Sequence, residues 1–175
     1  MRFSRGGGQL RQRRSMIFDS PASIRQWRPI NDGVMGGVSS SAFRFDPQGF
    51  AVFEGQVSLA FGGGFASVRA VTPDFARANF EGISLQAWGD GKRYKLNLFT
   101  DQSFDGVAYQ TEFLPPAGDW ATVFLPKESF VASFRGRPVA QAPALDGSRI
   151  AQVGLMIASK QAGPFCLKLR RILAT

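Results

Sequence analysis

The 175-residue sequence contains no histidine and one cysteine, and it has no long apolar run. Without histidine, the commonest general base and metal ligand is missing, and Ser-His-Asp and Cys-His catalytic sites are excluded. A single cysteine cannot form an internal disulfide, and zinc needs more ligands than one thiolate. No apolar stretch approaches the ~20 residues that a transmembrane helix needs. We therefore expect a binding protein rather than an enzyme, with no catalytic residue, no metal and no cofactor.

Acidic residues are absent from both ends of the chain, so the formal net charge of +8 comes from the two ends rather than from the middle. Residues 1–14 carry five arginines and no acid, and residues 149–175 carry five basic residues and no acid. The stretch between them holds 11 basic and 13 acidic residues. In a regular final strand Lys168 and Arg170 share one face, and Arg171 points the other way unless a bulge intervenes. The support for nucleic-acid binding is thus thinner than the net charge suggests.

Residues 1–15 are rich in Gly and Arg and offer almost nothing apolar to bury, so we expect a flexible basic tail. The ordered pattern begins at Met16, which is an alternative start of translation. The segment lacks the apolar region of a secretory signal, while its arginines leave a mitochondrial presequence open. We expect a cytoplasmic bacterial protein, with the mitochondrial matrix as the alternative.

From Met16 onward, short β-rich runs alternate with Gly, Pro, Asp and Asn. Residues 94–98 and 165–169 alternate apolar and polar side chains, which is typical of strands with one face on a core. Ten strands are expected, at 16–19, 41–46, 50–59, 64–71, 83–88, 94–100, 107–113, 120–125, 150–158 and 164–173. Short helices are expected at 21–27, 73–80 and 127–134, and a long irregular stretch covers 126–149.

This pattern predicts an all-β fold: one β-sandwich domain over residues 16–175, with about ten strands and one to three short helices. We expect a monomer with no transmembrane segment. Cys166 lies in an alternating run and is expected to act as a small hydrophobic side chain.

Two glycine-dense motifs are the most unusual features of the sequence, Trp27–Ser39 and Phe61–Arg69. Their glycines permit positive φ or close backbone approach, and Asn31 and Asp32 can accept bonds from neighbouring amides. The first motif is either a self-bracing turn at the end of the sandwich, which we favour, or a binding rim. We also hypothesise a bidentate bond between Arg69 and Asp32, because an inward-facing arginine must be paired.

Together, the two motifs resemble the complex I intermediate-associated protein 30 family. The likeness continues through Gly89-Asp90-Gly91, Trp120 and Arg135-Gly136 and covers about residues 16–174. It implies a galactose-binding-domain-like jelly roll and a non-enzymatic assembly-factor or chaperone role. The partner would be a protein subunit of a respiratory complex, such as NADH:ubiquinone oxidoreductase, or of a photosynthetic complex. The family has no established catalytic residues.

The candidate binding residues belong to the two motifs, with one aromatic and one basic residue from later in the chain. They are Asn31, Asp32, Met35, Gly36, Gly37, Ser39, Gly63, Gly64, Ser67, Arg69, Trp120 and Arg135. Two alternative functions stay open. One is a carbohydrate-binding module with Trp27, Trp88 and Trp120 as platforms. The other is an RNA-associated domain, in a photosynthetic or bacterial context, that uses the basic ends of the chain.

Overall fold

A computed structural model describes residues 15–175, and for Val34 and Met35 it describes the backbone alone. The predicted tail lies outside these residues apart from Ser15. The strands are β1 (Ser15–Ile17), β2 (Arg28–Pro29), β3 (Ser40–Asp46), β4 (Phe50–Val57), β5 (Ala66–Val71), β6 (Gly82–Trp88), β7 (Tyr94–Phe99), β8 (Ala108–Phe113), β9 (Trp120–Pro126), β10 (Val131–Phe134), β11 (Arg137–Pro138), β12 (Gln152–Ile157) and β13 (Gly163–Ala174). The 3-10 turns are η1 (Pro21–Ile24), η2 (Asp32–Met35), η3 (Ala60–Gly62), η4 (Pro73–Phe75), η5 (Lys127–Ser129) and η6 (Gly147–Arg149).

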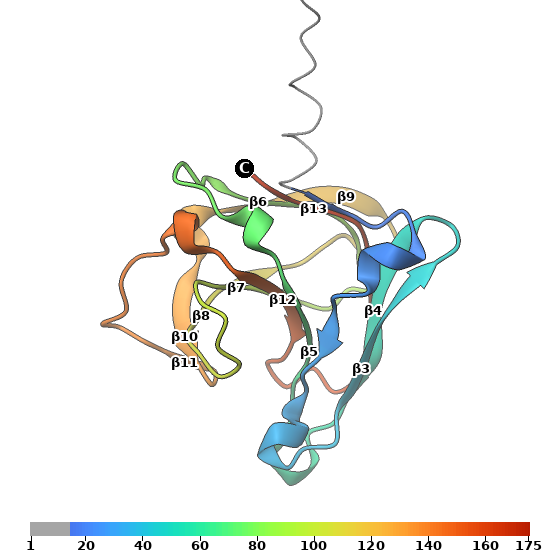
Figure 1. Cartoon of the computed structure of the whole chain (residues 1–175). Helices are drawn as coiled ribbons and strands as arrows, with labels where there is room; N and C mark the ends of the chain where they lie inside the picture. Colours follow the sequence, from blue (N-terminus) through green and yellow to red (C-terminus); the bar gives the residue numbers. More distant parts are fainter. Residues whose placement is uncertain (1–14) are drawn as a thin grey trace, which may run out of the picture.

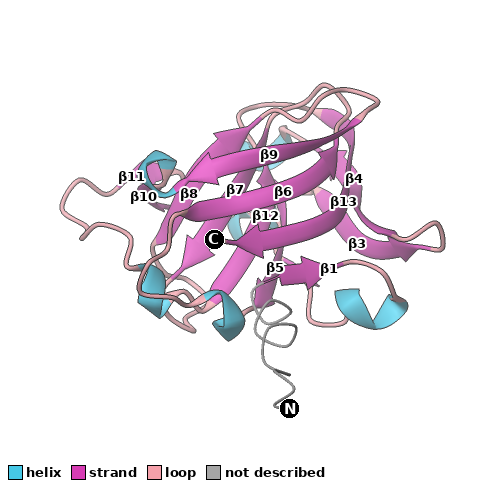
Figure 2. Ribbon diagram, turned by 90° about the horizontal axis from the view of Figure 1, so that it is seen from above, coloured by secondary structure: helices cyan, strands magenta, loops and turns pink. Residues whose placement is uncertain are grey.

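The strands form two antiparallel sheets that face each other across one core (Figures 1 and 2). Sheet A has the order β3-β4-β13-β6-β9, and β1 pairs with the second half of β13. Sheet B has the order β11-β10-β8-β7-β12-β5-β2. Most neighbours in each sheet are distant in sequence, so the fold is a double-sheet jelly roll and the all-β expectation is confirmed.

The core lies between the inner faces of the two sheets. Leu85 and Leu167 from sheet A and Leu96 and Leu155 from sheet B are fully buried. Phe53 packs against the rings of Tyr94 and Phe165, with ring centroids 6.3 and 4.9 Å away. Alternation along each strand directs these side chains inward and turns the residues between them to the outer faces of the sheets.

All ten expected strands are present within about two residues, which is the usual uncertainty of element boundaries. The expected helix over 127–134 is wrong, because the chain makes only η5 there. It then pairs as β10 with β8 and buries Phe130. The expected irregular stretch 126–149 is therefore largely structured. The other two expected helices are short 3-10 turns, and no described helix is long and apolar enough to cross a membrane.

Candidate functional site

The carboxylate of Asp32 joins the two glycine-dense motifs. Its side chain is fully buried and accepts four hydrogen bonds. Ser39 donates two of them, from its backbone N–H to Oδ1 (2.9 Å) and from its hydroxyl to Oδ2 (2.5 Å). In the second motif, the backbone N–H groups of Gly64 and Phe65 donate to Oδ2 at 2.8 and 3.4 Å. A buried charge is stable only when it is satisfied in this way.

The hydrogen bonds around Asp32 stabilise its charged carboxylate form. Burial alone would raise the pKa of the carboxyl, but the bonds from the Ser39 hydroxyl and the backbone N–H groups of Gly64, Ser39 and Phe65 outweigh it. The pKa of Asp32 is therefore lowered from its ordinary value of 3.8. Near neutral pH the loop is thus braced by a permanent negative charge.

Two of the motif glycines are required because the Asp32 carboxylate touches their backbone. A Cβ atom on Gly37 would overlap the carboxylate carbon, and one on Gly63 would lie 2.5 Å from Oδ2. Gly36 has φ +87° and ends η2 in a left-handed conformation that favours glycine. Gly33, in contrast, has open space where a Cβ would stand.

Asn31 makes the second connection between the motifs. Its Oδ1 accepts from the Ser41 hydroxyl at 2.7 Å and from the Ser67 backbone N–H at 3.0 Å. The Ser67 hydroxyl donates to the Ile30 carbonyl oxygen. Asn31, Asp32, Ser39 and Ser67 are thus all engaged in holding the two motifs together. These contacts are those of the self-bracing turn that the sequence favours.

The braced loops, residues 31–39 and 58–65, form a projection that we call the braced tip; Figure 1 shows it at the lower end of the sandwich, away from the C-terminus. Its surface is apolar: Phe61 is 78% exposed, Val38 58% and Leu59 45%. Phe61 also has φ +56° and ψ +31°, a left-handed conformation that is strained for a residue other than glycine. Phe61 therefore exposes its aromatic ring while its backbone adopts an unfavourable conformation.

The hypothesised bond between Arg69 and Asp32 is wrong. The Asp32 carboxylate lies within the braced tip and bonds only to groups there. The Arg69 guanidinium lies 3.8 Å from the centroid of the Phe99 ring and donates to the carbonyl oxygen of Phe104 at 2.8 Å. Arg69 lies on the outer face of sheet B, opposite Gly154, so it never enters the core that made a carboxylate partner necessary. Burial against the aromatic ring lowers the pKa of Arg69.

Two further candidate residues lie away from the tip. Arg135 forms an ion pair with Asp105 at 2.6 Å, which fixes the loop that follows β7. Trp120 lies on the outer face of sheet A, where the Arg170 guanidinium covers its ring. Met35 ends η2 within the tip. The structure thus brings together the candidates from residue 31 to Ser67 and places Arg69, Trp120 and Arg135 elsewhere.

The tryptophans expected as sugar platforms are not open rings. Trp27 is 5% exposed and its ring stacks on Phe43 with centroids 4.4 Å apart, so it belongs to the core. Trp88 and Trp120 lie on the surface, but Lys168 and Arg170 lie over them. Burial raises the pKa of the Cys166 thiol, which disfavours the reactive thiolate. Residues 15–175 contain no cluster of His, Cys, Asp or Glu suited to a metal ion.

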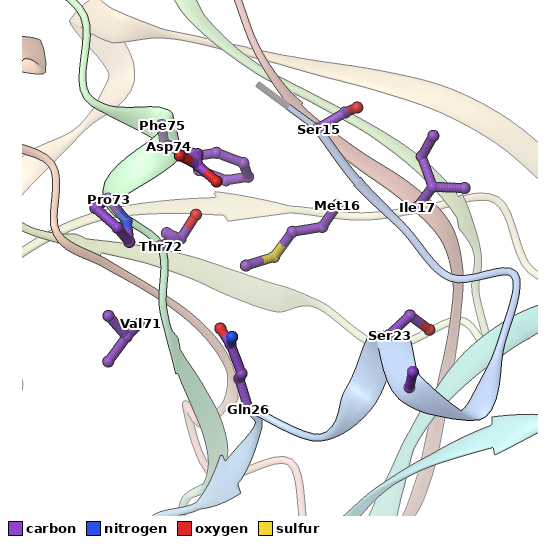
Figure 3. Close-up of a pocket in the computed structure, with 11 residues that line it drawn as sticks. Ser15, Met16, Ile17, Ser23, Gln26, Val71, Thr72, Pro73, Asp74 and Phe75 are labelled. Carbon is purple, nitrogen blue, oxygen red and sulfur yellow. The ribbon is translucent and has the colours of Figure 1, made fainter. Parts of the chain in front are cut away.

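A hollow of about 390 Å³ lies between β1, η1 and η4 (Figure 3). Met16 and Phe75 contribute apolar surface to it, and Gln26, Thr72 and Asp74 contribute polar groups. No candidate residue from the sequence lines this hollow. Ser15, the first described residue, also lines it.

Sequence reasoning missed Phe61 and the packing of cations on Trp88 and Trp120. Phe61 precedes three glycines, and that composition only marks a bend. In the structure Phe61, Gly62 and Gly64 all have positive φ, and local sequence reasoning expects such conformations at the glycines alone. The sequence leaves open whether a bulge turns Arg170 and Arg171 to the same side, and the register shift between Leu169 and Arg171 shows that it does.

Solved structures with the same architecture include carbohydrate-binding modules. One is the family 11 module from Clostridium thermocellum, solved with a β-1,3-1,4-mixed-linked tetrasaccharide. It superposes with a TM-score of 0.65 at 16% identity, and the match covers 91% of this chain and 95% of the module. A part of an agarase matches 93% of this chain but only 25% of its own, with a TM-score of 0.54 at 11% identity. At these identities the similarity shows the fold alone.

Curated relatives are more informative. The chain is 24% identical over 174 residues to the mitochondrial complex I intermediate-associated protein 30 of Drosophila melanogaster, and it spans 59% of that protein's length. It is 29% identical over 181 residues to an uncharacterized protein of Schizosaccharomyces pombe, of which it covers 83%. The profile of the complex I intermediate-associated protein 30 family matches residues 16–169, a range that includes both motifs of the braced tip. The chain belongs to this family.

Proposed function

We propose that this chain is a non-catalytic protein-binding module that holds a subunit of a membrane-bound respiratory complex during assembly. Family membership supports the role, because the Drosophila relative is named as a complex I intermediate-associated protein. The observation that carries the proposal is Phe61, which is 78% exposed and is held at positive φ on the braced tip. Exposed apolar side chains on a strained, rigid backbone are typical of binding surfaces.

The braced tip suits a protein partner for an energetic reason. The buried Asp32 bonds fix the loops before binding, so little conformational freedom is lost when Phe61 enters a pocket on the partner. Leu59 and Val38 surround it with further apolar area. A central aromatic anchor with apolar neighbours is the usual composition of an interface hot spot.

Co-purification tests this proposal. The tagged full chain is isolated in mild detergent from its source cells, and bound proteins are identified by mass spectrometry. We expect recovery of subunits of a membrane complex, reduced about tenfold or more by Phe61→Ser. Phe104→Ser is the matched control, because Phe104 is 62% exposed on another loop, and it should leave recovery unchanged.

Two results would contradict the proposal. Equal recovery by the folded Phe61→Ser variant would reject the tip as the docking element. Failure of the wild-type chain to retain any membrane-complex subunit would reject the assembly role. Circular dichroism of each variant confirms that it is folded.

The outer face of sheet B favours carbohydrate binding as a second candidate function. Arg69, Gly154 and Asn97 lie side by side on three neighbouring strands, and Gln110 donates to the Asn97 Oδ1 at 2.8 Å. At Gly154 the backbone lies close to Asn97 and the Phe99 ring, and exposed Phe104 stands at one side. Polar groups beside an aromatic ring can bind a sugar, and structural neighbours are carbohydrate-binding modules.

A glycan array probed with the full chain tests this second candidate. Carbohydrate binding predicts a response to at least one neutral glycan that Gln110→Ala weakens. A flat response to the whole array would reject it. Because Gln110 lies outside the braced tip, this result is independent of subunit recovery.

A further inference from the structure

The last strand carries three cations on the outer face of sheet A, which Figure 2 shows in front. In a regular strand Lys168 and Arg170 would share this face, and Arg171 would point into the core. Instead, the register shifts between Leu169, opposite Ala87, and Arg171, opposite Gln86. Leu169 and Ile172 are both fully buried, so the two arginines between them face solvent together.

Two of these cations are fixed on tryptophan rings. Lys168 Nζ lies 4.1 Å from the ring centroid of Trp88, and Arg170 Cζ lies 4.1 Å from that of Trp120. The two tryptophans are directly opposite each other on β6 and β9. Such contacts hold the cations in place and reduce the side-chain freedom lost on binding. We call Trp88, Trp120, Lys168, Arg170 and Arg171 the cation–indole face.

The charge of this face is unbalanced. None of its cations belongs to an ion pair among residues 15–175. Glu81 lines the same hollow as Arg171 without bonding to it, and Asp46 and Glu54 are bonded to Arg44. β1 runs beside the second half of β13, with Ile17 opposite Arg171, and adds no charged side chain to this surface. Three cations that are not bonded to a carboxylate on one surface favour an anionic partner.

We propose that the cation–indole face binds an Asp/Glu-rich segment of a protein partner; only the protein nature of that partner rests on the proposed function. Guanidinium groups bind carboxylates through paired hydrogen bonds, and Arg170 and Arg171 are exposed for this. A single-stranded nucleic acid would stack its bases on open rings, but cations cover these rings. Insertion into a lipid surface adds apolar burial to charge attraction, but exposed Ile17 and Phe124 are separated by β13 and β6 and form no continuous apolar patch.

Titration of the full chain with a synthetic Glu-rich peptide tests the proposal, with the same peptide carrying Gln for Glu as the reference. Tryptophan fluorescence reports on the site, because Trp88 and Trp120 belong to it and Trp27 is buried in the core. We expect the Glu-rich peptide to bind and the Gln peptide not to bind. Affinity should fall with salt and fall about tenfold or more in Arg170→Gln/Arg171→Gln.

Matched variants separate the site from general charge attraction. Arg137→Gln/Arg149→Gln removes the same charge from exposed positions outside this face and should change affinity less than about twofold. Replacement of all five arginines in residues 1–14 by Gln should lower affinity less than Arg170→Gln/Arg171→Gln does. An equal or larger loss in either variant would overturn the proposal.

Two other probes test the class of partner. Oligouridine and phosphatidylserine–phosphatidylcholine vesicles should bind more weakly than the Glu-rich peptide, and tighter binding of either through Arg170 and Arg171 would overturn the proposal. Phe61→Ser should leave the peptide affinity unchanged. Lost peptide binding with intact subunit recovery therefore rejects this site alone, and the opposite result rejects only the proposed function.

Discussion

At the scale of single residues, Asp32 explains why the two motifs contain glycine where they do. Its carboxylate touches the backbone at Gly37 and Gly63, and it accepts bonds from both motifs. The sequence correctly indicates that Asp32 bonds to neighbouring amides. It does not indicate which amides, because Gly64 comes into reach only when β5 pairs beside the first motif. The error over Arg69 has the same origin, since nothing local tells which face of β5 is inward.

Gly37→Ala and Gly33→Ala form a matched pair that tests this close approach. The methyl group at 37 would overlap the Asp32 carboxylate, so we expect unfolding to become easier by about 1–3 kcal/mol. The methyl group at 33 meets open space, and a change below about 0.5 kcal/mol is expected. Urea denaturation measures both. Equal effects would show that the carboxylate does not limit the backbone.

Asp32→Asn should destabilise the fold by about 3 kcal/mol, because an amide N–H₂ would face N–H donors inside a buried site. The lowered pKa of Asp32 sets the pH dependence. The contribution of the carboxylate is fully present above its ordinary value of 3.8 and is lost as the pH falls through the lower folded-state pKa. As the pH falls below 3.8, the stability of the wild type should therefore decrease more steeply than that of Asp32→Asn. Parallel curves in urea titrations at several pH values would contradict this.

Phe61→Asn separates binding from stability at the tip. Asparagine tolerates the left-handed conformation better than phenylalanine does, so we expect unchanged stability or a gain of about 0.5–1 kcal/mol. The same variant should lose the membrane-complex subunit in co-purification. Thermal unfolding and recovery are measured on one preparation. A clear loss of stability would mean that the ring supports the fold and is not held for a partner.

At the scale of elements, alternation predicts strands well where one face is buried. It identifies β4, β7 and β13 because their inward residues are apolar at every second position. It misses β10, whose four residues form a short strand near the edge of sheet B and follow a Lys-Glu turn. It also cannot reveal the bulge in β13, because Arg170 and Arg171 look like a single interruption of the pattern. The partner strand β6 decides where the extra residue lies.

Deletion of single residues tests that bulge. Arg170 takes no part in the pairing of β13 with β6, so its removal leaves all pairs available and keeps Leu169 and Ile172 inward. We expect a folded protein that loses no more than about 1 kcal/mol. Removing Leu169 instead moves an arginine to the buried position opposite Ala87, and we expect failure to fold or a loss above about 3 kcal/mol. Equal behaviour of the two deletions would contradict the bulge at Arg170.

At the scale of the whole molecule, the two sheets hold two unlike surfaces apart. The braced tip at one end is apolar and rigid, and the cation–indole face on sheet A is basic and aromatic. The first would supply affinity through burial of Phe61, and the second would supply orientation through charge. Strand pairing places both surfaces, so the sequence pattern could predict the sandwich without predicting either of them.

Photo-crosslinking from position 61 tests the central role of the tip most directly. A photoreactive phenylalanine analogue replaces Phe61 or, as the control, Phe104 in the full chain, and crosslinked proteins are identified from source-cell membranes. We expect a subunit of a membrane complex to be crosslinked from position 61 and not from position 104. Equal labelling from both positions, or none from position 61 while the subunit still co-purifies, would contradict docking through the braced tip.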